Sequence, residues 1–241
     1  MRFPGEVWLL PPEAREEGDP KPRRHVLLTR CEDEGDVGIL SYASTSAIEA
    51  AFGGASVLVD PFARGYQHTG FVAPTHVTPC RLVSAASEDM WNLKGRLIDE
   101  MPEVRRALAR ALGIGTGTAR SGVASGSLRG RVIELSVALA EECGARFAVT
   151  LSEPGYSLRR RYQIVALVLD PAEYETETDD VLVTGEAWVR AIDLRLSAAI
   201  LPLRLLQSAF HPLDIARVLP AVVDDGTIGR VDRALVSLFG L

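Results

Sequence analysis

The sequence predicts a mainly β protein with α-helices, of the α+β class, built from two similar halves that are each a small barrel closed by a C-terminal helix. Two observations carry this prediction. Short runs rich in β-forming residues alternate with loops rich in Pro, Gly and charge. Each half also ends in an Ala/Leu-rich helical pattern that is followed by glycine. The chain has 241 residues, which is long enough for two such domains.

The first half, residues 1–114, is predicted to hold several strands and one helix. The strands are expected at residues 5–10, 24–30, 37–42, 56–60 and 71–82. Residues 101–112 then place apolar side chains at helical i, i+3, i+4 spacing, with arginines on the other face. Gly113 is the expected C-cap of this helix.

A linker and a connecting helix are predicted between the halves. Residues 115–127 are almost entirely Gly, Ser, Thr and Ala, with little to bury, and this composition favours a domain boundary. Residues 128–145 follow as a predicted amphipathic helix that ends near Gly144.

The second half, residues 146–241, parallels the first and predicts a duplicated fold. Its late strand pairs Pro202 with Pro79 and Arg204 with Arg81. The final helix reads VDRALVSLFGL, against VRRALARALGI in the first half. Length differences fall in loops, as a duplication should show. The alternative is that two unrelated β-rich halves with Ala/Leu-rich ends look alike by chance.

Composition excludes several classes of protein. The net charge of −6 argues against holding duplex DNA by overall charge, because phosphate binding is driven by Lys and Arg. Three cysteines without a CxxC pair argue against a disulfide scaffold and indicate a reducing, cytoplasmic location. No apolar run reaches the ~18 residues of a membrane helix, so no membrane partner is expected. The four scattered histidines predict no metal site, and no cofactor is expected.

Several short motifs, taken in order, resemble one protein family. These are GEVW near the start, RHVL after a charged loop, a strand that ends in Ser/Thr, the late strand VTPCRLV and the closing Val-x-x-Ala-Leu helix. Together they resemble the PemK/MazF-type toxins over residues 5–114, and more faintly over residues 146–241. The resemblance implies SH3-like barrels with a C-terminal helix. It further implies endoribonucleases that cut single-stranded RNA without metal, act as homodimers and are paired with antitoxins.

The resemblance also implies the site residues. Arg24 would hold the scissile phosphate, and Ser44 or Thr45 would hydrogen-bond a phosphate oxygen. The residues expected to bind RNA around them are Lys21, Arg23, Arg81, Arg161 and His76. In the second half Arg161 is aligned with Arg24, and no hydroxyl stands at the matching place of the next strand, VLVTGEAW. The alternative for Arg24 is a solvated arginine at a strand start.

The sequence therefore leads to two functional hypotheses. The first is a toxin-like, metal-independent endoribonuclease that acts on single-stranded RNA as an intramolecular pseudo-dimer, with an antitoxin-like protein as partner. In this hypothesis the chain is a monomeric pseudo-dimer that could pair further. The alternative is a catalytically inactive module of the same fold that docks a regulatory protein in a stress or defence system. A nucleic-acid-binding structural subunit unrelated to toxins is a third, weaker interpretation.

Overall fold

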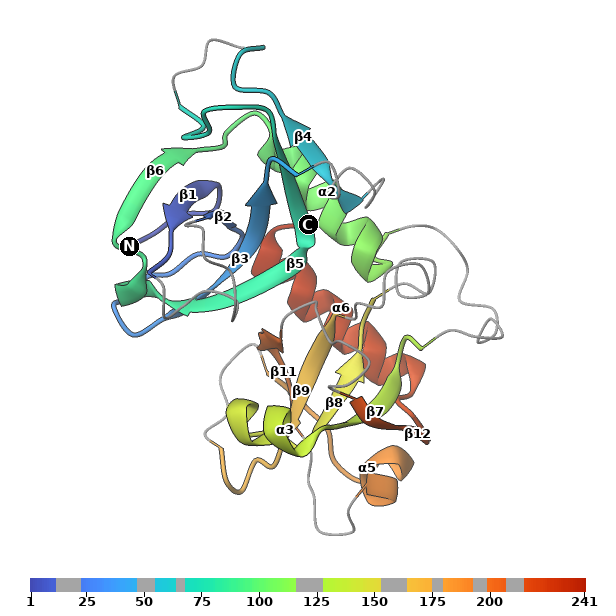
Figure 1. Ribbon diagram of the computed structural model, residues 1–241. Coiled ribbons are helices and arrows are strands. Elements are labelled where there is room, and N and C mark those ends of the chain that lie inside the picture. Colours follow the sequence, from blue (N-terminus) through green and yellow to red (C-terminus); the bar gives the residue numbers. More distant parts are fainter. Residues whose placement is uncertain are drawn as a thin grey trace. The chain divides into compact units, whose positions relative to one another are not determined.

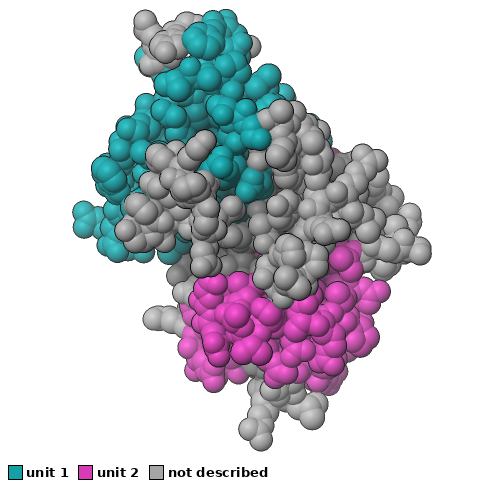
Figure 2. Space-filling model, in the orientation of Figure 1, with its two compact units in different colours: residues 1–110 teal, residues 111–241 magenta. Residues whose placement is uncertain are grey.

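The computed structural model is α+β, with two curled antiparallel sheets and few helices (Figure 1). The structure describes residues 1–11, 23–46, 55–63, 68–115, 128–152, 164–174, 180–192, 199–206 and 215–241. The chain divides into two compact units, Met1–Arg110 and Ala111–Leu241, which Figure 2 colours separately. Each unit contains one of the sheets.

Unit 1 contains one six-stranded sheet in the order β4-β5-β3-β2-β1-β6. The elements are β1 (Glu6–Leu9), β2 (Arg24–Leu27), β3 (Val37–Ser44), β4 (Val57–Val59), β5 (Thr75–Ala86), the 3₁₀ turn η3 (Ser87–Asp89), β6 (Asn92–Arg96) and α2 (Met101–Leu112). The predicted strands overlap β1 to β5, and α2 has the predicted bounds. Strand β6 was not predicted, because its sequence NLKGR is polar and includes a glycine.

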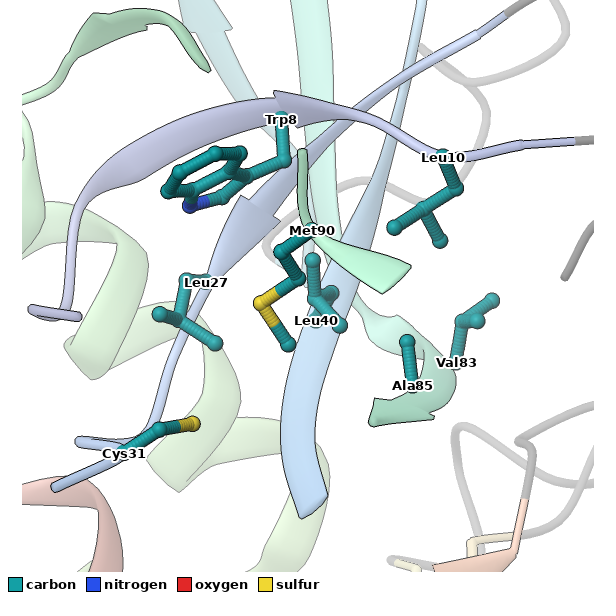
Figure 3. Packing of buried hydrophobic residues seen from close by; sticks show 8 residues of the cluster. All are labelled: Trp8, Leu10, Leu27, Cys31, Leu40, Val83, Ala85 and Met90. Carbon is teal, nitrogen blue, oxygen red and sulfur yellow. The ribbon is translucent and has the colours of Figure 1, made fainter. Parts of the chain in front are cut away.

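The inner face of this sheet carries an apolar core. Trp8 and Leu10 from the first strand region meet Leu27, Leu40 and Met90 there, together with Cys31, Val83 and Ala85 (Figure 3). All of these side chains are at least 95% buried. Because successive strand residues point to opposite faces, this core fixes which side chains of β2 and β3 face inward.

Unit 2 contains the second sheet, in the order β10-β11-β9-β8-β7-β12. The elements are β7 (Arg131–Leu135), α3 (Val137–Cys143), β8 (Phe147–Thr150), β9 (Val165–Leu169), β10 (Val181–Leu182), α5 (Ala187–Ile192), β11 (Ala199–Leu206), β12 (Ile215–Val222) and α6 (Asp225–Phe239). The single helix predicted over 128–145 is therefore a strand followed by a short helix. The second sheet begins at β7, and not at residue 146 as predicted.

The two sheets have the same strand order once β7 to β12 are matched with β1 to β6. The irregularities match as well. Between β3 and β5 the partner residue jumps from Thr78 to Leu82, and between β9 and β11 it jumps from Leu201 to Leu205. Both skipped segments contain the Pro-x-Arg pattern from which the duplication was predicted. A shared bulge supports a common origin because such bulges are kept as designed features of a fold.

A glycine before the first strand has the same role in both units. Gly5 accepts a hydrogen bond from Leu97 N (2.7 Å), and Gly130 accepts one from Val223 N (2.9 Å). Both glycines have a positive φ, +92° and +77°, which other residues adopt at a cost. Each bond joins the start of the sheet to the segment that precedes the closing helix. The two units thus close in the same way.

Candidate functional site

Polar side chains gather on the inner face of the unit 1 sheet, beyond the apolar core. His25 on β2 pairs with Tyr42 on β3, and Tyr42 in turn pairs with Thr78 on β5. Ser44 pairs with His76 two residues along. Cross-strand partners lie on the same face of a sheet, so these side chains form one continuous row.

Two arginines complete this group around the Tyr42 ring. The Arg23 guanidinium donates a hydrogen bond from Nη1 to Ser44 Oγ at 3.3 Å, and its Cζ lies 5.1 Å from the centre of the Tyr42 ring. The Arg81 Cζ lies 3.9 Å from the same ring centre. A guanidinium close to an aromatic ring is attracted by the negative ring face, which holds the cation in place. The Tyr42 ring therefore holds two guanidiniums, and one of them, Arg23, also reaches the Ser44 hydroxyl.

The interior end of the group is closed by His25. Its ring meets the Tyr42 ring edge-on, with the centroids 5.8 Å apart. His25 is 3% exposed and Tyr42 is 5% exposed, so both belong to the packed interior. Ser44 is also buried, and its Oγ accepts a second hydrogen bond from Ser46 N at 3.1 Å. These bonds leave the Ser44 hydroxyl its hydrogen to donate.

His76 lies on the solvent side of the group. Its Nδ1 is 3.2 Å from Ser56 Oγ, within hydrogen-bond distance. Its partner on β4 is Leu58, which is 57% exposed, and His76 itself is half-buried. The row of polar side chains thus runs from the buried His25 to an edge of the sheet that reaches solvent.

The arginine that contacts Ser44 is Arg23 and not Arg24, the residue predicted to hold the phosphate. Arg24 pairs with Leu9 on β1, and strand alternation turns its side chain to the opposite face from His25. The sequence offers two adjacent arginines and does not say which one faces Ser44, which strand pairing decides. Arg24 is therefore not part of this group.

The other predicted site residues have different outcomes. The structure brings together Arg23, Ser44, Arg81 and His76. Thr45 lies just after β3 with an exposed side chain. Lys21 and Arg161 lie outside the described residues.

Unit 2 carries apolar residues where unit 1 carries this polar group. The strand registers match Ala148 with His25, Leu167 with Tyr42 and Leu169 with Ser44. These three belong to a buried apolar cluster that also contains Ile133, Leu135, Ala145 and Val165. The predicted alignment of Arg161 with Arg24 is therefore wrong, because β8 has the place of β2 in unit 2.

Helix α3 covers this apolar cluster. Leu139, Ala140 and Cys143, all on α3, pack against it. The helix begins at Ser136, whose Oγ accepts a hydrogen bond from Leu139 N at 3.3 Å, and ends at Gly144 with a left-handed φ of +66°. It connects β7 with β8, and so has the place in the chain that the segment between β1 and β2 has in unit 1. The face that is polar in unit 1 is therefore filled and capped in unit 2.

The counterpart of Arg23 in unit 2 has a different partner. Arg146 donates from Nε and Nη2 to Glu134 Oε1 at 2.9 and 2.7 Å, while Arg217 donates to Oε2 at 2.9 Å. Hydrogen bonds from Arg146, followed by those from Arg217, lower the pKa of Glu134 below its ordinary value, against the opposing effect of burial. This arginine is therefore bound to a carboxylate, which it shares with Arg217, and not to a hydroxyl as Arg23 is.

Reasoning from sequence missed three residues of the unit 1 group, namely His25, Tyr42 and Ser56. A signal for two of them was present, since Tyr42 and Ser44 are two residues apart on one strand, as are Arg23 and His25. Ser56 comes to His76 only through the pairing of β4 with β5, which carries no local signal.

The group thus combines two guanidiniums with hydroxyl and imidazole groups, a set of side chains suited to an anion. Within the described parts of the chain, no three His, Cys, Asp or Glu side chains are placed to hold a metal ion. No described helix is long and apolar enough to cross a membrane. No family model matches this sequence, and no curated protein matches it either.

Proposed function

We propose that the chain is a metal-independent endoribonuclease that acts on single-stranded RNA and resembles the PemK/MazF-type toxins. Each unit is then an SH3-like barrel closed by a helix, and unit 1 holds the working site. The observation that carries the proposal is the contact between Arg23 and Ser44, with Arg81 held over Tyr42 beside it. Two guanidiniums and a hydroxyl at one place are suited to a phosphodiester.

The proposed roles follow from the chemistry of RNA cleavage. Attack of the 2′-oxygen on phosphorus builds negative charge on the phosphoryl oxygens, and preorganised donors there lower the barrier. Arg23 and Arg81 supply fixed positive charge, since a guanidinium keeps its proton at any working pH. The Ser44 hydroxyl donates a hydrogen bond to one of the same oxygens. Arg23 thus takes the phosphate-binding role that the resemblance had given to Arg24.

Unit 2 has a supporting role in this proposal. Its face is apolar and capped by α3, so it contributes no chemistry of its own. In a family whose members act as homodimers, a second barrel in the same chain replaces the second subunit. Covalent linkage raises the effective concentration of the two barrels to roughly millimolar, so pairing does not depend on protein concentration.

The test is cleavage of a mixed-sequence single-stranded RNA in EDTA by the purified chain. We expect 2′,3′-cyclic phosphate ends, and no cleavage of DNA of the same sequence, which lacks the nucleophile. Arg23→Ala should lower kcat/KM by about 10²-fold or more, the usual effect of losing one transition-state donor. Arg24→Ala is the matched comparison, and its loss should be far smaller. A parent protein that leaves RNA intact, and is harmless when expressed in bacteria, contradicts the nuclease proposal.

A specific observation favours a second candidate, an inactive module of the same fold that docks an antitoxin-like or regulatory protein. In unit 2 the matching positions carry the apolar residues Ala148, Leu167 and Leu169. The net charge of −6 also disfavours RNA as a ligand. In this case the chain leaves RNA intact, and Arg23→Ala changes only the affinity for the protein partner.

A further inference from the structure

His76 is the histidine of the unit 1 group that has access to solvent. It is half-buried, it stands opposite Ser44 in the register of β3 and β5, and its neighbour on β4 is the exposed Leu58. His25, the other histidine of the group, is 3% exposed and packs against the interior side of Tyr42. An RNA strand that reaches Ser44 from solvent therefore meets His76 and not His25.

The contact with Ser56 fixes which ring nitrogen of His76 is available. Nδ1 lies 3.2 Å from Ser56 Oγ, and among the described residues Nε2 has no hydrogen-bond partner. When Ser56 accepts from Nδ1–H, Nε2 is the ring nitrogen left to face a substrate. A hydrogen bond to one ring nitrogen commonly selects the state of the other in this way.

We propose that His76, in its imidazolium form, donates the proton to the 5′-oxygen that leaves during RNA cleavage. The inference deepens the proposed nuclease function and rests on it. The two guanidiniums of the group cannot serve, because arginine does not release its proton in proteins. Histidine ordinarily changes its charge between pH 5 and 8, so it can hold a proton and release it during turnover.

The step balances without any further reagent. The 2′-oxygen forms its bond to phosphorus while its proton passes to water. The bond between phosphorus and the 5′-oxygen breaks, and its electron pair stays on that oxygen. The proton from His76 Nε2 joins this pair to give a 5′-hydroxyl, leaving a 2′,3′-cyclic phosphate on the other fragment. His76 then takes a proton back from water, with Ser56 holding Nδ1–H throughout.

A substrate with a modified leaving group tests this role directly. When sulfur replaces the 5′-oxygen at one linkage of the RNA, the leaving group departs as a thiolate, which needs no acid. On ordinary RNA, His76→Gln should lower the cleavage rate by about 10²-fold or more, within the usual range for a general acid. On the sulfur-containing RNA, the same variant should cleave within about tenfold of the parent, because the acid is no longer needed.

Two controls separate the possible results. His68→Gln removes an exposed loop histidine and should cleave both substrates as the parent does. Rescue of His76→Gln by the sulfur substrate also shows that the variant is folded. A variant that loses the same factor on both substrates overturns the role of His76 as the acid, and so does one that cleaves ordinary RNA normally. Failure of the parent on ordinary RNA counts instead against the nuclease proposal itself.

Discussion

Single residues show how closely the two units match inside and how far they differ at the site. Thr29 Oγ1 accepts a hydrogen bond from Ile39 N at 3.0 Å, and Ser152 Oγ accepts one from Ile164 N at 3.1 Å. Both hydroxyls are buried and occupy equivalent positions after the second strand of their sheet. A buried backbone N–H without an acceptor is costly, so a hydroxyl is needed at this position in both units.

Replacing either hydroxyl should destabilise the unit that contains it. Thr29→Val keeps the volume but leaves Ile39 N–H without its acceptor, and we expect a loss of about 1–3 kcal/mol in the free energy of unfolding. Ser152→Ala should cost a similar amount in unit 2. Urea unfolding followed by circular dichroism measures both values. A variant as stable as the parent would show that another acceptor takes over the bond.

The stability contribution of Glu134 should depend on pH with a defined sign. Its pKa in the folded protein is lowered, first by the hydrogen bond from Arg146 and also by Arg217. A carboxyl with a lowered folded-state pKa stabilises the fold above its ordinary pKa and loses this effect as pH falls through the folded value. Glu134→Gln should therefore be less stable than the parent at pH 7, by about 1 kcal/mol, because both arginines are well exposed.

The measurement is the thermal unfolding midpoint of parent and Glu134→Gln at several pH values. The two curves should approach each other as pH falls through the lowered folded-state pKa of Glu134, where the parent carboxyl itself becomes protonated. A gap that stays constant down to acidic pH would assign the effect to packing and not to charge.

At the scale of whole elements, the two glycines at the start of the sheets provide a matched pair. A Cβ atom on Gly5 would lie 2.3 Å from the Leu97 backbone oxygen, whereas a Cβ on Gly130 would have its nearest neighbours at 3.7 Å. Both positions have positive φ, so alanine is strained at either one.

Gly5→Ala should therefore cost much more stability than Gly130→Ala. We expect about 1 kcal/mol for Gly130→Ala from backbone strain alone. The Gly5 variant adds displacement of the segment that joins β6 to α2, which removes the bond to Leu97 as well. Equilibrium unfolding of both variants gives the comparison. Equal losses would mean that the Leu97 segment moves aside without cost.

Elements also show where prediction from sequence succeeds and where it ends. The helix at Met101–Leu112 was predicted with its bounds because its apolar spacing and its terminal glycine agree. Strand β7 was read as helix because Arg131–Leu135 and Val137–Cys143 together also fit a helical spacing. That error shifted the matches of β8 and β9 by one strand, which is why Arg161 was aligned with Arg24, whereas the later match of Pro202 with Pro79 agrees with the structure. At the site, the sequence was enough to locate the second and third strands. It was not enough to tell whether Arg23 or Arg24 faces inward, because strand pairing decides this and depends on residues far apart in the chain.

At the scale of the whole molecule, the two units share a topology but not a site. Unit 1 places Arg23 beside a hydroxyl, whereas in unit 2 the equivalent Arg146 is bound to Glu134. If activity resides in unit 1 alone, the two arginines differ in their importance for function.

Arg146→Ala should therefore leave RNA cleavage near the level of the parent, while Arg23→Ala loses it. The two variants remove the same side chain from equivalent positions, so each controls for general effects of losing an arginine. Initial rates on one RNA substrate at fixed protein concentration make the comparison. Equal losses in both variants would place chemistry in both units.

The identical strand order also has a consequence for how the chain folds. Two neighbouring copies of one topology can exchange equivalent strands, and this kind of misassembly is typical of tandem domains. Here the exchange of β2 with β8 would put His25 among Ile133, Leu135 and Leu167, where a polar ring lacks partners. It would also leave Tyr42 facing Ala148 across a gap. We therefore expect the different side chains at these matched positions to disfavour strand exchange between the two units.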